Sequence, residues 1–292
     1  MENWTLIATL NTFGLYIGIL FANGAFYYRL IFETSTAQLY FSTKKTIVAF
    51  VWLAIVCVGL SYSLKAINLT GEINSAFDTE LLSILWQTPI GTVFIQQLCG
   101  LVLIYCSLFF SKIGVFFGII GSLLTLSSFT YIGHTSGDAN IWLKPLLFVH
   151  LFAISVWMGI LLPLIKLSQQ IEAVKTTVEI ARKFSKLASF FVPLLILCGG
   201  ILSVKLVGSI DNLFNTEYGQ GLLWKILTIS AVLLLALFNK IKFAGERHFS
   251  HSNASHKTFK TLRISIVIES LLIAIVLFVT AIITNFFAAP NI

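Results

Sequence analysis

The chain has 292 residues, of which 57% are hydrophobic and only 11% are charged, and its mean hydropathy is strongly positive. Soluble globular proteins carry about 25% charged residues, so the composition excludes a water-soluble globule and predicts an all-α bundle of membrane-spanning helices. The formal net charge of +7 does not indicate nucleic-acid binding, because the basic residues collect in the loops on one side of the predicted membrane.

Eight apolar runs are long enough to cross a bilayer, since about twenty helical residues at 1.5 Å each cover its hydrocarbon core. In chain order, the predicted spans are 4–32, 46–66, 89–111, 113–133, 144–166, 186–206, 219–242 and 264–287. The first run follows no Lys or Arg and is too long for a signal peptide, so we expect it to remain as a span. No linker rich in Pro, Gly or Ser divides the chain, and we predict one transmembrane domain over 1–292.

The predicted loop 67–88 is acidic and contains an apolar stretch, Leu81–Trp86. This stretch is typical of a short amphipathic helix that lies along a membrane surface. In contrast, the predicted loops 167–185 and 243–263 are polar and basic.

Two spans carry small residues at helical spacing, Gly14-x-x-x-Gly18 and Gly114-x-x-x-Gly118. Small residues allow close approach of helix backbones in lipid. Both motifs therefore predict faces that pack against other helices of the same chain.

The Lys and Arg residues predict the orientation in the membrane. If the N-terminus lies outside, fifteen of them fall on the inner side and only Lys65, Lys144, Lys205 and Lys225 fall outside. Cytoplasmic loops collect Lys and Arg. Both termini are therefore predicted to face the periplasm or the cell exterior.

The four cysteines, Cys57, Cys99, Cys106 and Cys198, all fall inside predicted spans and form no C-x-x-C motif. No structural disulfide is predicted, and we interpret them as small apolar packing residues. As an alternative, Cys57, Cys99 and Cys198 lie at similar depths and are weaker candidates for soft Cu(I) ligands.

Two histidines lie in the outer half of adjacent predicted spans. His134 lies at the outer end of the fourth span, four residues before Asp138, and His150 lies about 9 Å into the fifth. Met158 follows about two turns deeper and is predicted to share the face of His150. Imidazole and thioether are copper ligands, so we predict a metal site at His134, His150 and Met158, with Asp138 as a weaker ligand. The alternative is that each histidine only packs or forms hydrogen bonds.

Glu269 lies inside the last predicted span, about 9 Å from its inner boundary, at a depth similar to Asn239 and Asn23. An ionisable group in lipid needs a partner or a function. Glu269 is either an inner relay for a proton or metal cation, and so a further candidate metal residue, or a protonated hydrogen bond between helices. Lys225, in the outer half of the seventh span, is assigned a structural role, either reaching toward water or pairing with Glu217 or Asp211.

The sequence lacks the motifs that are typical of several other classes of function. A tract with His248, His251 and His256 is interpreted as a polar loop, with metal binding as the alternative. The chain has no phosphate-binding loop and no Ser-His-Asp or Cys-His arrangement, and it has only two methionines. We therefore expect neither nucleotide-driven transport nor an enzyme, and we name no catalytic residue.

Several motifs together are similar to the pattern of the copper-resistance protein D family (CopD/PcoD). They are Gly133-His134, His150-x6-Trp157-x-Gly159, Phe184-Ser185, Gly199-Gly200, Tyr218-Gly219-x5-Lys225, Asn239 and Glu269, within 130–285. The resemblance implies a multi-pass protein of the bacterial inner membrane with eight spans. It also implies copper homeostasis or resistance, with copper received from a separate periplasmic partner of the copper-resistance protein C type.

Combining residues and resemblance, we expect copper ions to be captured at His134 and His150 and transferred inward. One alternative is an electron-transfer protein that binds haem b between two histidines. Another is a docking or sensing platform for the periplasmic copper protein that transports nothing.

Overall fold

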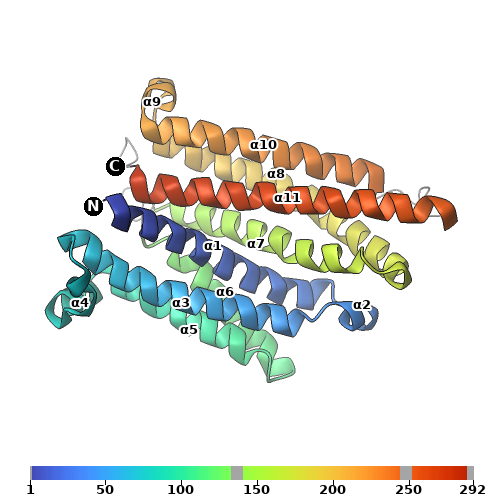
Figure 1. Cartoon of the computed structure of the whole chain (residues 1–292), viewed down its shortest axis with the longest axis horizontal. Coiled ribbons are helices and arrows are strands. Elements are labelled where there is room, and N and C mark those ends of the chain that lie inside the picture. Colours follow the sequence, from blue (N-terminus) through green and yellow to red (C-terminus); the bar gives the residue numbers. More distant parts are fainter. Residues whose placement is uncertain (1, 133–140, 244–251, 288–292) are drawn as a thin grey trace.

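The computed structural model describes residues 2–132, 141–243 and 252–287, and these residues form helices without any strand (Figure 1). The α-helices are α1 (Glu2–Ile31), α2 (Ser35–Tyr40), α3 (Thr43–Thr70), α4 (Thr79–Trp86), α5 (Pro89–Cys106), α6 (Lys112–Ser128), α7 (Leu143–Leu167), α8 (Val174–Val207), α9 (Ile210–Asn215), α10 (Glu217–Phe243) and α11 (Ser252–Phe286). Short 3-10 helices cover Ile73–Phe77 and Ile171–Ala173.

Seven of the described helices are long and apolar enough to cross a bilayer. They are α1, α3, α5, α7, α8, α10 and α11. An eighth apolar helix, α6, has 17 residues, which is about 25 Å of helix. These eight helices occur at the eight predicted positions, so the predicted all-α transmembrane bundle is confirmed.

Helix ends differ from the predicted spans. The third span was expected to reach residue 111, but α5 ends at Cys106, and the Ser107 hydroxyl donates to the carbonyl of Ile104 at 2.6 Å. By contrast, α8 and α11 are longer than the predicted spans. They begin at Val174 and Ser252, inside the polar segments that precede the apolar runs. Hydropathy marks the part of a helix that faces lipid, whereas polar residues can continue the same helix into water.

The predicted helix over Leu81–Trp86 is confirmed as α4. The Asp78 carboxylate caps it by accepting from the backbone N–H groups of Glu80 and Leu81, at 2.9 and 3.2 Å. From α3, the Tyr62 hydroxyl donates to the carbonyl of Leu82 at 2.6 Å. Side chains therefore attach α4 to the neighbouring span.

Small residues bring the long helices into contact, as predicted. A Cβ at Gly18 of α1 would lie 2.9 Å from the backbone of Ala54 in α3. A Cβ at Gly121 of α6 would lie 2.5 Å from the carbonyl oxygen of Gly100 in α5. The closest crossing joins α1 to α7, where a Cβ at Gly159 would lie 2.0 Å from the carbonyl oxygen of Gly24.

The bundle places α3, α5 and α6 on one side of the pair α1 and α7, and α8, α10 and α11 on the other (Figure 1). The start of α1 and the end of α11 lie at the same end, which we call the termini end (Figure 1). Many apolar side chains of α8 and α10 are exposed, including Leu197, Val204, Trp224 and Leu234. Such faces suit contact with lipid, and this is a multi-pass membrane protein.

Candidate functional site

The imidazole of His150 is half-buried between α7 and α8. Its Nδ1 lies 3.2 Å from the carbonyl oxygen of Leu195 in α8. A carbonyl oxygen only accepts, so Nδ1 carries the hydrogen in the neutral ring and Nε2 keeps a free lone pair. Metal-bound histidines commonly hold their second nitrogen in this way.

Gly199 of α8 provides the space for this ring. A Cβ at Gly199 would lie 3.0 Å from Cε1 of His150 and 3.4 Å from its Nδ1. The neighbouring Gly200 has no atom within 4 Å of a Cβ built on it. Only the first glycine of the pair therefore packs against the histidine.

Lys225 of α10 is half-buried, and its positive charge acts on His150. Among the described residues, no carboxylate forms an ion pair with Lys225, so pairing with Glu217 or Asp211, one of the two alternatives for this residue, is not seen. A copper ion at His150 would be repelled by this ammonium unless an anionic ligand accompanied the metal or the lysine side chain moved away.

A second polar cluster joins α7, α10 and α11 around Glu269. Trp157 Nε1 donates to Glu269 Oε1 at 2.7 Å, and Asn239 Nδ2 donates to Oε2 at 3.0 Å. The Ser265 hydroxyl donates to Asn239 Oδ1 at 2.6 Å, which orients the amide. Only 4% of Glu269 is exposed. The expected hydrogen bond between helices is present, and each carboxylate oxygen accepts one N–H group.

His150 and the Glu269 cluster follow each other along one face of α7. Trp157 lies seven residues after His150, which is about 10 Å along the helix and within about 20° of the same direction. On α10, Lys225 and Asn239 are fourteen residues apart and also share a face. The structure therefore places two polar levels in the half of the bundle made by α7, α8, α10 and α11, with His150 nearer the termini end.

Met158 lies in a different environment from His150. It is fully buried in a hydrophobic cluster with Ile19 and Leu20 of α1. Eight helical residues turn the chain by about 80° relative to His150, so Trp157 shares its face more closely. Asn23 is also separate from Glu269, because its amide donates to Thr125 Oγ1 of α6 at 3.0 Å.

The cysteines are spread over several helices. Cys57 packs beside Gly14, Cys99 is exposed, and Cys198 is buried on α8 directly before Gly199. Within the described ranges, no three His, Cys, Asp or Glu side chains are gathered in a way that could hold a metal ion. Asp138 and His134 lie outside these ranges, as do His248 and His251, and the side chain of His256 is not described.

Two family models match the chain. The model described as copper resistance protein D-like, N-terminal domain, matches residues 1–144, and the model described as copper resistance protein D matches residues 178–283. These ranges contain α1 to α6 and most of α8 to α11, respectively. No curated protein and no solved structure matches the chain.

Proposed function

The chain belongs to the copper resistance protein D family, and from this premise we propose that it carries copper ions across the bacterial inner membrane, from the periplasm inward. The observation that supports a metal role is the hydrogen bond from His150 Nδ1 to the Leu195 carbonyl. It leaves Nε2 as a ligand for copper, which imidazole binds well.

In this proposal, His134 and His150 capture copper at the termini end, and Glu269 is the next polar group along the transfer route. The shared face of α7 supports this order, because Glu269 is bonded to Trp157, about 10 Å further along from His150. Met158 is enclosed by the cluster around α1 and is not needed on this route. Copper is delivered by a periplasmic protein of the copper-resistance protein C type, and no catalytic step is involved.

Metal analysis of the purified protein tests the capture site. After loading with copper and removal of excess metal, the wild type is expected to retain copper and His150→Ala to lose most of it. Lys225→Met is the matched control, because it removes the neighbouring positive charge but no ligand. We expect this variant to retain at least as much copper as the wild type. Equal copper in the wild type and His150→Ala would contradict the proposal.

Transport is tested separately, in liposomes with copper on the outside. The wild type should accumulate copper and the variant with alanine at both His134 and His150 should not, while both insert equally. Binding without accumulation by the wild type would favour a docking or sensing platform. A visible spectrum of the same preparation tests haem, since a Soret band that His150→Ala abolishes would favour electron transfer.

A further inference from the structure

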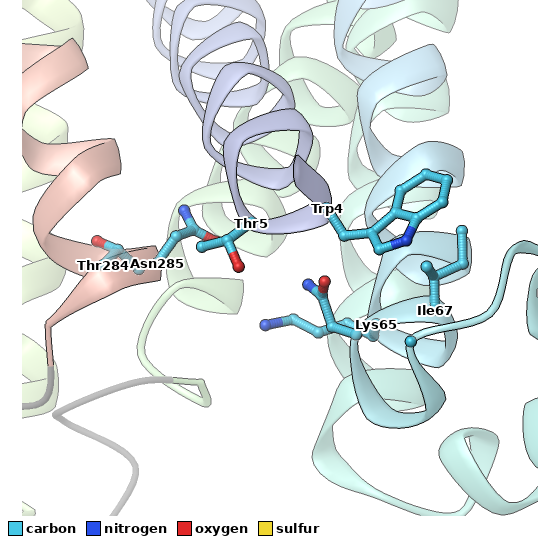
Figure 2. A pocket seen from close by; sticks show the side chains of 8 residues that line it. Trp4, Thr5, Lys65, Ile67, Thr284 and Asn285 are labelled. Carbon is cyan, nitrogen blue, oxygen red and sulfur yellow. The ribbon is translucent and has the colours of Figure 1, made fainter. Parts of the chain in front are cut away.

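A polar cavity of about 240 Å³ lies at the termini end, between α1, α3 and α11 (Figure 2). Its polar and aromatic side chains are Trp4, Thr5, Lys65, Asn68, Thr284 and Asn285. Among the residues whose side chains are described, no Asp or Glu lines it. The cavity therefore offers one full positive charge and several neutral polar groups.

The free hydrogen-bond donors of the cavity come from α3. Lys65 and Asn68 are three residues apart and so are neighbours on the helix surface. Neither side chain forms a hydrogen bond or ion pair with another described residue. In Figure 2, the Lys65 side chain extends toward Thr284, Asn285 and Thr5 on the opposite wall.

The opposite wall is held in place by its own hydrogen bonds. Asn285 Nδ2 donates to Thr12 Oγ1 at 3.1 Å and to the carbonyl of Ala281 at 2.9 Å. The Thr284 hydroxyl donates to the carbonyl of Thr280 at 2.8 Å. A ligand would thus meet a fixed wall on α11 and unpaired donors on α3.

Tryptophans indicate the level of this cavity in the membrane. Trp4 lies near the start of α1, Trp86 ends α4, and Trp142 directly precedes α7. These helix ends all belong to the termini end, and Trp86 and Trp142 are 50% and 81% exposed. Tryptophan is enriched at the level of lipid headgroups. The cavity beside Trp4 therefore lies where phosphodiester groups are abundant.

We infer that this cavity binds the phosphodiester of a phospholipid headgroup. Lys65 Nζ pairs with the phosphate oxygens and the Asn68 amide donates to them, which matches the acceptors of a phosphate. Phosphatidylglycerol is favoured over phosphatidylcholine, because the choline cation of the latter competes with Lys65 for the phosphate. This inference does not rest on copper transfer.

Native mass spectrometry of the protein in detergent, with defined amounts of each lipid, tests the inference. The wild type should retain phosphatidylglycerol in preference to phosphatidylcholine. Lys65→Ala should weaken this binding on the order of ten-fold, since a hydrogen bond to a charged group is lost, and Asn68→Ala should weaken it less. Lys205→Ala is the control, because Lys205 is also exposed near the termini end but lines an apolar surface of α8.

Thermal unfolding without lipid should be similar for all four proteins, since Lys65, Asn68 and Lys205 are exposed. Equal loss of lipid from Lys65→Ala and Lys205→Ala would overturn the inference. Inorganic phosphate provides the second arm of the test. If it displaces phosphatidylglycerol at equal concentration, the cavity is a site for free phosphate and not for lipid.

Discussion

At the scale of single residues, Gly199 provides a test of the His150 site that leaves every ligand in place. A methyl group at Gly199 would lie 3.0 Å from the imidazole, so the ring must move by a few tenths of an ångström, which disturbs its hydrogen bond with Leu195. We expect Gly199→Ala to lower copper affinity about ten-fold, which corresponds to about 1.4 kcal/mol. Isothermal titration with copper in detergent measures this effect.

Gly200→Ala is the matched control for that substitution. Its methyl group meets nothing within 4 Å, and replacing a helical glycine by alanine stabilises a helix by about 0.5–1 kcal/mol. Copper affinity should remain unchanged while thermal stability stays equal or rises. If both alanine variants bind copper like the wild type, the packing of His150 against α8 does not matter for the metal.

The Glu269 cluster is tested by removing one donor while keeping a smaller aromatic side chain at the same position. Trp157→Phe deletes the N–H that reaches Glu269 Oε1 at 2.7 Å. Leaving a buried acceptor unpaired costs about 1–3 kcal/mol, so we expect a loss of unfolding free energy in that range. Denaturant unfolding in mixed micelles measures it.

A double-mutant cycle shows whether the two side chains act together. In a Glu269→Leu background no side-chain acceptor remains for the Trp157 N–H, so Trp157→Phe should cost at least about 1 kcal/mol less than it does in the wild type. If the two losses simply add, Trp157 stabilises the bundle through packing alone and the hydrogen bond contributes nothing measurable.

At the scale of helices, the crossing of α1 and α7 depends on two glycines. A Cβ at Gly159 would lie 2.0 Å from the carbonyl oxygen of Gly24, a backbone atom that cannot move without its helix. We expect Gly159→Ala to destabilise the protein by about 1–3 kcal/mol, the usual cost of overpacking. The midpoint of thermal unfolding in detergent should fall accordingly.

Gly59→Ala in α3 provides the comparison for that loss. No atom lies within 4 Å of its added Cβ, so this variant should be as stable as the wild type or more so. A stable Gly159→Ala protein would mean that the two helices can separate at little cost.

The sequence predicted the helices better than their ends. Eight apolar runs identified eight helices because length and hydropathy depend only on local residues. The start of α8 at Val174 was missed because residues outside lipid leave no hydropathy signal. Helix packing was predicted where small residues marked it, at Gly18 and Gly118.

At the scale of the whole molecule, the candidate site was predicted only in part. His150 was identifiable because a histidine inside a span is rare and costly. The bond between Trp157 and Glu269 joins residues 112 positions apart and depends on how α7 packs against α11. The spacing of seven residues from His150 to Trp157 and the similar depth of Asn239 and Glu269 were usable signals, but neither of them predicts that Trp157 contacts Glu269.

The two family matches leave α7 between them, and α7 connects the two groups of helices. It crosses α1 at Gly24, and it carries both His150 and Trp157 toward α8 and α11. The proposed copper route therefore depends on how α7 is held by the N-terminal helices. A substitution at the glycine crossing should affect copper binding as well as stability.

The orientation of the whole bundle remains a prediction, and single cysteines can test it. Ser83 of α4 is exposed at the termini end, and Ser35 of α2 is exposed at the opposite end. In a background without the four native cysteines, Ser83→Cys should react with a membrane-impermeant maleimide in intact cells. Ser35→Cys should react only after the membrane is opened. The physical reason is the predicted distribution of Lys and Arg, since the sequence assigns fifteen of nineteen to the side of Ser35. The reverse labelling pattern would place His150 near the cytoplasm and reverse the proposed direction of copper transfer.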